Sequence, residues 1–163
     1  MQAQFEIKDL HDQELREALL SLNNASTRET SVLTPQRFDQ LIGMARVALF
    51  IPPAAALLLA FEQSAEYDGG HFLWFRSRFS KFLYVDRVVV AEKHRRHGIG
   101  RKLYADVFEW AVRLGQSHVV CEVNLQPPNL ASDKFHAAQG FEEVGRATID
   151  DGAKTVRYLA AKL

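Results

Sequence analysis

The sequence lacks several features that would assign it to a specialised class. Its 163 residues include one cysteine, Cys121, so no disulfide can form within the chain. Its most apolar stretch, residues 47–61, is divided by Pro52 and Pro53 into halves too short to cross a bilayer as helices. The first residues lack the basic region and apolar core of a signal peptide. These absences favour a reduced, cytoplasmic compartment and no membrane association.

The sequence also has no excess of charge. It contains 20 basic and 20 acidic residues, and its formal net charge is zero. This balance argues against a general nucleic-acid binder, although it leaves room for local charged patches. A composition that is 47% hydrophobic and 25% charged is typical of a globular domain. No internal repeat or linker is visible, so we expect a single domain over residues 1–163.

The hydrophobic patterning predicts alternating strands and helices. Helices are expected over residues 11–22, 34–44, from the glycines at 98 and 100 to Leu114, and from Asn129 to Gly140. Strands are expected over residues 4–7, 45–51, 54–61, 82–90, 119–123, 141–149 and 155–163. Residues 23–33 and 63–70 are predicted loops, whereas residues 71–81 have no secure assignment. This order predicts an α/β (α+β) fold, a mixed sheet with helices on both faces.

One strand and the turn after it carry the strongest signal. The strand over residues 82–90 ends in three valines, which predicts burial on both faces. It leads to Arg95-Arg96-His97-Gly98-Ile99-Gly100 and then directly into a helix. Glycines let the backbone approach a ligand closely, and the first helical amides and the helix dipole favour an anion. With the positive charges of Arg95, Arg96, Arg101 and Lys102 nearby, we expect a pyrophosphate group to bind there.

Two familiar phosphate motifs do not fit this turn. A dinucleotide-binding turn would have a third glycine at position 103, where the chain has Leu103. A nucleotide-triphosphate loop would need Gly-Lys-Ser or Gly-Lys-Thr, which is absent from the sequence. A helix that merely begins after a basic loop stays open as the alternative.

Two motifs give the chain a resemblance to a known family. The run Arg95–Gly100 fits the pattern Arg or Gln, any two residues, Gly, any one residue, and then Gly or Ala. Downstream, Asn129 precedes a short expected helix that ends at Gly140-Phe141. The chain thereby resembles the GNAT acetyltransferase superfamily, and in particular a little-characterised bacterial-type branch. The resemblance is strongest from Phe82 to Leu163; Glu92 departs from it, because the family often has proline there.

The resemblance implies a fold and a cosubstrate. The fold would be a GNAT fold with a splayed central strand pair, an acceptor-side half over about residues 1–81 and an acetyl-CoA-binding half over about 82–163. The backbone of Val88, Val89 and Val90 would pair with the pantetheine arm, which Asn129 would also touch. The pyrophosphate would lie against the turn formed by Arg95, Arg96, His97, Gly98, Ile99, Gly100 and Arg101. No metal-ligand spacing is present, so no metal is expected.

Acyl transfer from a thioester to an amine requires two proton transfers. The amine must lose a proton from a group whose pKa is about 10.4, and the departing thiolate benefits from a donor. Many family members place a tyrosine donor where this chain has His136. We predict that His136 is the general acid, because a protonated imidazole could donate; a surface histidine on the helix is the alternative.

Two strand carboxylates, Asp86 and Glu122, are the candidates for the base, because a buried strand carboxylate must be paired or functional. Alternation predicts that Tyr84, Asp86 and Val88 share one face, unless a bulge intervenes. An ion pair with Arg87, Arg76 or Arg78 is the other interpretation of Asp86. Some branches of the family have a glutamate base at the position of Tyr84, so a water relay would have to replace it here.

The resemblance therefore predicts direct transfer of an acetyl group from acetyl-CoA to a primary amine of a small amine, an amino acid or a protein. A small-molecule acceptor is favoured over a protein, nucleic acid or membrane, and a homodimer is allowed. A non-catalytic acyl-CoA binding module is the alternative. The acceptor pocket is expected from residues 23–31 and the aromatic residues Tyr67, Phe72, Trp74 and Phe75, with Phe72 and Phe75 assigned to the core. Cys121 is expected to be a buried structural thiol.

Overall fold

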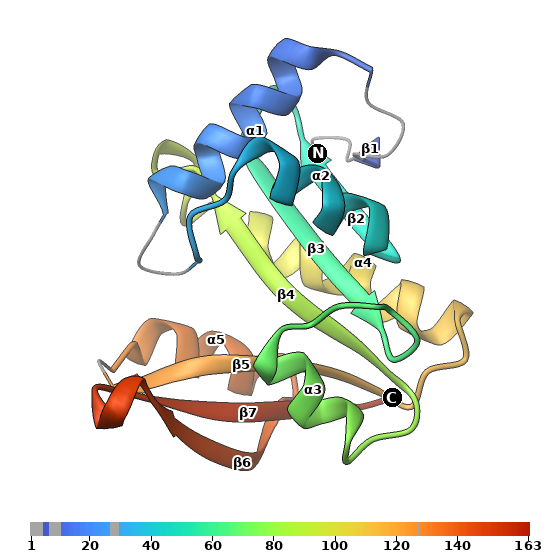
Figure 1. Ribbon diagram of the computed structural model, residues 1–163, viewed down its shortest axis with the longest axis vertical. Helices are drawn as coiled ribbons and strands as arrows, with labels where there is room; N and C mark the ends of the chain where they lie inside the picture. The colour runs from blue at the N-terminus through green and yellow to red at the C-terminus, as the bar shows by residue number, and fades with distance from the viewer. Residues whose placement is uncertain (1–4, 7–10, 27–29, 127) are drawn as a thin grey trace.

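A computed structural model describes residues 5–6, 11–26, 30–126 and 128–163 (Figure 1). Its helices are α1 (Gln13–Ala25), α2 (Pro35–Met44), α3 (Gly70–Arg76), α4 (Ile99–Arg113) and α5 (Leu130–Ala138). Its strands are β1 (Phe5–Glu6), β2 (Val47–Ile51), β3 (Ala56–Glu62), β4 (Phe82–Val90), β5 (His118–Gln126), β6 (Glu142–Ile149) and β7 (Lys154–Lys162). The described strands form one sheet in the order β1-β2-β3-β4-β5-β7-β6. All neighbours are antiparallel except β4 and β5, which are parallel.

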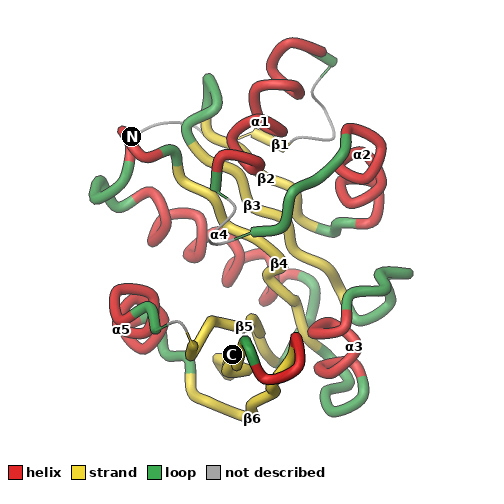
Figure 2. The backbone as a smooth tube through the Cα atoms, turned by 60° about the vertical axis from the view of Figure 1, so that its left-hand side comes forward, coloured by secondary structure: helices red, strands yellow, loops and turns green. Residues whose placement is uncertain are grey.

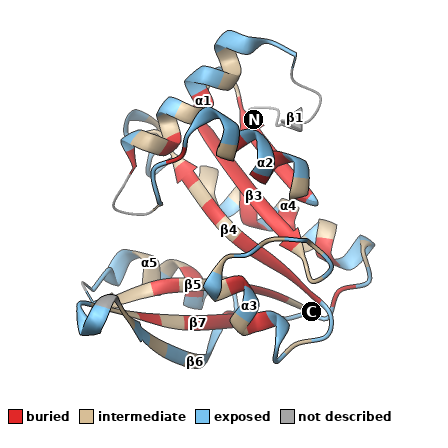
Figure 3. Ribbon diagram, viewed as in Figure 1, coloured by how far each residue is buried: buried red, intermediate tan, exposed pale blue. Residues whose placement is uncertain are grey.

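Helices cover both faces of this sheet, as predicted (Figures 1 and 2). Residues of α1, α2 and α3 join one buried cluster with one face of the sheet, whereas residues of α4 and α5 pack with the opposite face. The middle strands are therefore largely buried along their length (Figure 3). The mixed α/β fold expected from the sequence is confirmed.

The helix boundaries follow from capping residues. Thr34 accepts a hydrogen bond from the backbone N–H of Arg37 at 3.1 Å, and Pro35 occupies the first turn, so α2 begins where predicted. Gly115, with a φ of 69°, ends α4 as expected. Helix α1 continues to Ala25, so part of the predicted 23–33 loop is helical, and residues 27–29 lie outside the described residues.

The structure also defines the segments around α3 and the first strand. The unassigned 71–81 segment contains most of α3, which begins at Gly70. Of the predicted first strand, Phe5 and Glu6 are extended, and Gln4 and Ile7 lie outside the described residues.

A β-bulge interrupts β4, which is the exception allowed for in the prediction that Tyr84, Asp86 and Val88 share a face. Leu59 of β3 pairs with Arg87 and Ala60 pairs with Val85, which leaves Asp86 as the extra residue. Tyr84 consequently packs in the core under α1 to α3, whereas Val88 packs toward α4.

The expected burial of all three valines on both faces is also wrong. Val89 is buried, but Val88 and Val90 are half-buried. The reason is that β5 stops pairing with β4 before it reaches them.

Candidate functional site

The site is built around the place where β4 and β5 part. The two strands pair from Phe82↔His118 to Tyr84↔Val120, and no later pair between them occurs in the described residues. On its other side, the stretch Val88–Val90 pairs with β3. Figure 1 shows β4 rising away from β5 after this point. The splayed central pair predicted from the sequence is therefore confirmed, and it leaves one backbone edge of Val88–Val90 without a strand partner in the described chain.

A cavity of about 440 Å³ lies along this open edge, and we call it the strand cavity. It brings together three segments that the sequence analysis singled out separately: the strand end Val88–Val90, the glycine turn Arg95–Gly100 and the start of α5. Its walls include Val88, Val89, Val90, Arg95, Gly100, Tyr104, Asn129, Ser132, Phe135 and His136.

The glycine turn has the backbone shape of an anion site. Gly98 caps α4 with a φ of 76°, and Arg96 has a φ of 66°. The Gly98 carbonyl accepts a hydrogen bond from the N–H of Lys102 at 3.0 Å, which begins the helix. The stretch Arg95–Gly98 is exposed, so the first helical amides face solvent rather than the core. The Arg95 Nε donates to the Val90 carbonyl at 3.2 Å, which directs that side chain toward the strand cavity.

Asn129 holds the start of α5 against the same cavity. Its side-chain oxygen accepts a hydrogen bond from the N–H of Ser132 at 3.1 Å, so it is the N-cap of the short helix expected after it. Across the cavity, the ring of Phe135 lies 3.5 Å from where a Cβ of Gly100 would stand. At that distance a Cβ would make ordinary van der Waals contact with the ring, so Phe135 packs over Gly100.

Two more cavities continue from the strand cavity toward α3. The inner cavity, about 200 Å³, shares the walls Val88, Tyr104, Asn129, Ser132 and His136 with the strand cavity. The outer cavity, about 320 Å³, shares His71, Asp86, Arg87, Glu122 and Lys154 with the inner one. The three cavities thus adjoin in a row, and the three predicted catalytic residues all line the inner cavity.

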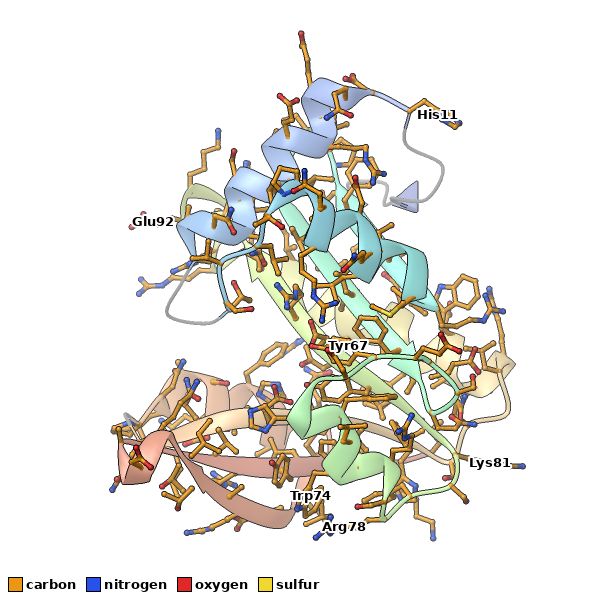
Figure 4. All side chains as sticks on the ribbon, in the orientation of Figure 1. His11, Tyr67, Trp74, Arg78, Lys81 and Glu92 are labelled. Carbon is orange, nitrogen blue, oxygen red and sulfur yellow. The ribbon has the colours of Figure 1, made fainter. Side chains whose placement is uncertain are left out.

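Asp86 is fully engaged by its neighbours. The Tyr67 hydroxyl donates to its Oδ1 at 2.8 Å, and the Nε of Arg87 donates to its Oδ2 at 2.7 Å. Arg87 also donates to the side-chain oxygen of Asn23 in α1 at 3.0 Å. The side chains of Asp86 and Arg87 are each 5% exposed, so this is a buried ion pair, the alternative interpretation of Asp86. Figure 4 shows Tyr67 in the middle of the molecule.

Glu122 has a different environment. Its Oε2 accepts one hydrogen bond, from the Tyr84 hydroxyl at 2.8 Å. Burial, and next the charge of Asp86, raises the pKa of Glu122 to about 8. A carboxyl group with this pKa exchanges its proton close to neutral pH, which is the range a general base needs.

His136 is buried, not a surface residue, with 9% of its surface exposed. Its Nδ1 lies 2.7 Å from the Ser132 carbonyl, which can only accept, so Nδ1 carries a hydrogen. Burial lowers the pKa of the imidazole, so at neutral pH its Nε2 is an acceptor. Nε2 lies 2.9 Å from the hydroxyl of Tyr104, which therefore donates to it.

Tyr67 lines the outer cavity, in agreement with its expected place in the acceptor pocket, whereas sequence reasoning missed the ionisable residues His71, Tyr104 and Lys154. Tyr104 carried a usable signal, since it is a hydroxyl four residues after Gly100, next to the apolar stripe of α4. The others come from segments with no pattern of their own.

The remaining expectations concern the core. Phe72 and Phe75 are fully buried, as predicted, and Cys121 is a buried thiol whose pKa is raised by burial. Trp74 stacks on the ring of Tyr158 with centroids 4.0 Å apart and does not line the three cavities. Within the described residues, no cluster of His, Cys, Asp and Glu could hold a metal ion, and no helix is long and apolar enough to cross a membrane.

Parted parallel strands beside a glycine turn that opens a helix are features of an acetyltransferase fold. The chain belongs to the acetyltransferase (GNAT) family, whose pattern it matches over residues 5–141. A curated relative, the aminoglycoside N(6')-acetyltransferase type 1 of Serratia marcescens, is 36% identical over 67 residues. That match covers 41% of this chain and 44% of the relative, so the chain spans less than half of the relative's length.

Solved structures share the fold at low sequence identity. The structure of the NatC complex bound to Gag peptide and CoA superimposes with a TM-score of 0.76 at 14% identity, covering 100% of this chain and 99% of that one. An aminoglycoside 6'-N-acetyltransferase complexed with coenzyme A gives 0.72 at 14% identity, covering 98% and 96%. The ribosomal-protein-S18-alanine N-acetyltransferase of Escherichia coli gives 0.70 at 14% identity, covering 99% and 94%. At these identities the likeness concerns the fold alone.

Proposed function

We propose that this chain is an N-acetyltransferase that transfers an acetyl group directly from acetyl-CoA to the primary amine of a small molecule. The observation that carries the proposal is the parting of β4 and β5, which joins a cavity along an open strand edge to an inner cavity with a titratable carboxylate. Family membership and the CoA named with two of the structural neighbours support it.

The residues fit a coenzyme A molecule. The open backbone edge of Val88–Val90 can accept the pantetheine arm as an added strand would. The turn Arg95–Arg101 offers helical amides and cations to the pyrophosphate. Asn129, at the boundary of the strand and inner cavities, would contact the pantetheine where the thioester enters. Acetyl-CoA would supply the activated acetyl group, and we propose no metal.

Glu122 is the proposed base. The raised pKa of about 8 makes it a stronger base than an ordinary glutamate, and Tyr84 orients it. In its ionised form it would take a proton from the attacking amine, directly or through one water. Asp86 is the less suitable base, because both of its oxygens already accept hydrogen bonds, from Tyr67 and Arg87. We therefore propose that Asp86 is a positioning residue.

Tyr104 and His136 are proposed to act together on the departing sulfur. In the neutral Nδ1–H form, His136 has no proton on Nε2 to give, whereas the Tyr104 hydroxyl beside it does. Tyr104 lines both the strand and inner cavities, so its hydroxyl can turn from Nε2 to the sulfur. His136 would hold Tyr104 in place; the role of direct acid predicted for it would require protonation against its lowered pKa. The amide of Val88 is the proposed oxyanion donor.

The wider setting belongs to the same proposal. Residues 1–163 would act as one domain, with the acceptor entering from the side of residues 1–81 and acetyl-CoA from the side of residues 82–163. The buried thiol of Cys121 suits a reducing cytoplasm. A homodimer stays a prediction.

Release of free CoA thiol is the test. The purified protein is incubated with acetyl-CoA and a panel of small amines, amino acids and aminoglycosides, with heat-treated protein as the control. We expect thiol release that depends on one class of amine, and a matching N-acetylated product by mass spectrometry. Acetyl-CoA that raises the melting temperature but is never consumed would favour the acyl-CoA binding module instead.

A further inference from the structure

The ionisable side chains at the acceptor end of the site indicate which chemical class of acceptor it binds. Five residues line both the inner and the outer cavity, and each of them is ionisable: His71, Asp86, Arg87, Glu122 and Lys154. Asp86 and Arg87 neutralise one another in their buried pair. Two groups then remain for a ligand: the carboxyl of Glu122, which can accept a proton when it is ionised, and the ammonium of Lys154.

These two side chains face the same space without closing on each other. Lys154 forms no ion pair within 4.0 Å with any carboxylate of the described residues. Its charge nevertheless acts on both neighbours: it opposes the raised pKa of Glu122 and, after burial, it lowers the pKa of His71. Lys154 is therefore near Glu122, with the cavity between them.

We propose, resting on the acetyltransferase function above, that the acceptor is a small amino carboxylate whose amine faces Glu122 and whose carboxylate faces Lys154. An amine acceptor that carries no carboxylate would leave Lys154 without a counter-ion in the cavity. A polycation such as an aminoglycoside would bring further ammonium groups toward Lys154, and like charges at this range repel. The cavities of about 200 and 320 Å³ lie at or below the usual range for drug-sized ligands, which suits a small acceptor.

The transfer balances without a further reactant. The amine nitrogen bonds to the acetyl carbon as the carbon–sulfur bond breaks, and the amine proton goes to Glu122. The sulfur takes a proton from the Tyr104 hydroxyl and leaves as the thiol of CoA. Glu122 and Tyr104 then return to their resting forms by proton exchange with solvent. Lys154 takes no part in these bond changes. It recognises the carboxylate and so sets the KM of the acceptor.

The experiment compares amino acids with their own carboxamides, which keep the amine and lose the negative charge, and includes kanamycin as a polycation. We expect kcat/KM to be about tenfold or more higher for an amino acid than for its carboxamide, as befits one charge-assisted contact. Lys154→Gln should bring this ratio to about one, with the KM for acetyl-CoA changed by less than about twofold. Lys154→Glu should reverse the preference in favour of the carboxamide.

Lys162→Gln is the matched control, because Lys162 is an exposed lysine at the far end of the same strand, outside all three cavities. It should leave the ratio unchanged. Equal rates with acids and carboxamides, better rates with kanamycin, or acetyl-CoA turnover with none of the amino carboxylates would overturn the inference and leave the acetyltransferase function standing. Absence of both acetyl-CoA binding and turnover would overturn the proposed function itself.

Discussion

Asp86 and Arg87 are consecutive residues whose side chains form a buried ion pair, with Nε and Oδ2 2.7 Å apart. On a regular strand, neighbouring side chains point to opposite faces of the sheet. The bulge that leaves Asp86 without a partner on β3 removes this alternation and lets the two side chains meet. Tyr67 and Asn23 join the pair, so one irregularity in β4 ties the loop before α3 and the end of α1 to the site.

Asp86→Asn should destabilise the protein strongly. The amide can still accept from Tyr67, but the buried Arg87 loses its counter-charge, which costs about 3–5 kcal/mol. At about 2–4 °C per kcal/mol, the melting temperature should fall by roughly 6–20 °C. Asp39→Asn is the control, because Asp39 pairs with Arg16 and its side chain is 63% exposed; its cost should stay below about 1 kcal/mol. Equal losses in the two variants would show that the Asp86 pair has no special weight.

Comparing Gly98→Ala with Gly115→Ala separates the contribution of a left-handed glycine to stability from its contribution to acetyl-CoA binding. They lie at opposite ends of α4 with φ values of 76° and 69°, and an added Cβ would touch nothing within 4 Å at either. Each variant should lose about 1–2 kcal/mol of stability through its backbone conformation. Gly98→Ala alone should also weaken acetyl-CoA binding, by about tenfold or more in calorimetric Kd, because the shifted turn misplaces its amides. Equal affinities of the two variants for acetyl-CoA would show that the turn does not bind this cosubstrate.

The rate should depend on the ionisation of Glu122. The base is active when ionised, so kcat/KM should fall as the pH drops below about 8, by close to tenfold per unit. Glu122→Gln keeps an acceptor for the Tyr84 hydroxyl and removes the titration, so it should lose about 10²–10⁴-fold in rate and the break near pH 8. The measurement is a profile of kcat/KM from pH 6 to 9.5. A wild-type break that persists in Glu122→Gln would mean that another group is the base.

Tyr104→Phe should lower kcat by about 10² or more, since it removes the proposed proton donor and keeps the ring. Its KM for acetyl-CoA should change little. His136→Phe should lower kcat less, because it removes the group that holds Tyr104 and not the donor. A loss in His136→Phe with none in Tyr104→Phe would assign the acid role to His136; no loss in either, at any pH, would exclude both residues from proton transfer.

Gly145 makes room for Trp74, which also lies under the guanidinium of Arg78 (Figure 4). A Cβ at Gly145 would overlap the indole, which is stacked on Tyr158, so Gly145→Ala should cost about 1–3 kcal/mol in denaturant unfolding. Gly43→Ala, in α2 with nothing within 4 Å, should stabilise the protein by about 0.5–1 kcal/mol. A change in the free energy of unfolding with the same sign in both variants would contradict this packing.

Local chemistry predicted much of the fold. The caps at Thr34 and Asn129, the stop at Gly115 and the apolar periodicity each depend on neighbours within a few residues, so they could be interpreted without a tertiary structure. The glycine turn was predicted for the same reason. The resemblance to the family added the splayed strands, which no local pattern in the chain encodes.

The sequence by itself determined the order of the elements, the glycine turn and the candidate residues His136, Asp86 and Glu122. Only the tertiary structure decided how these three differ. Alternation along β4 would have placed Val88 on the face of Tyr84, but the bulge, which depends on pairing with β3, puts Val88 on the opposite face. The burial that raises the pKa of Glu122, and the contact between Tyr104 and His136, join residues 32 or more positions apart. Such contacts arise from packing between elements, which no short stretch of sequence specifies.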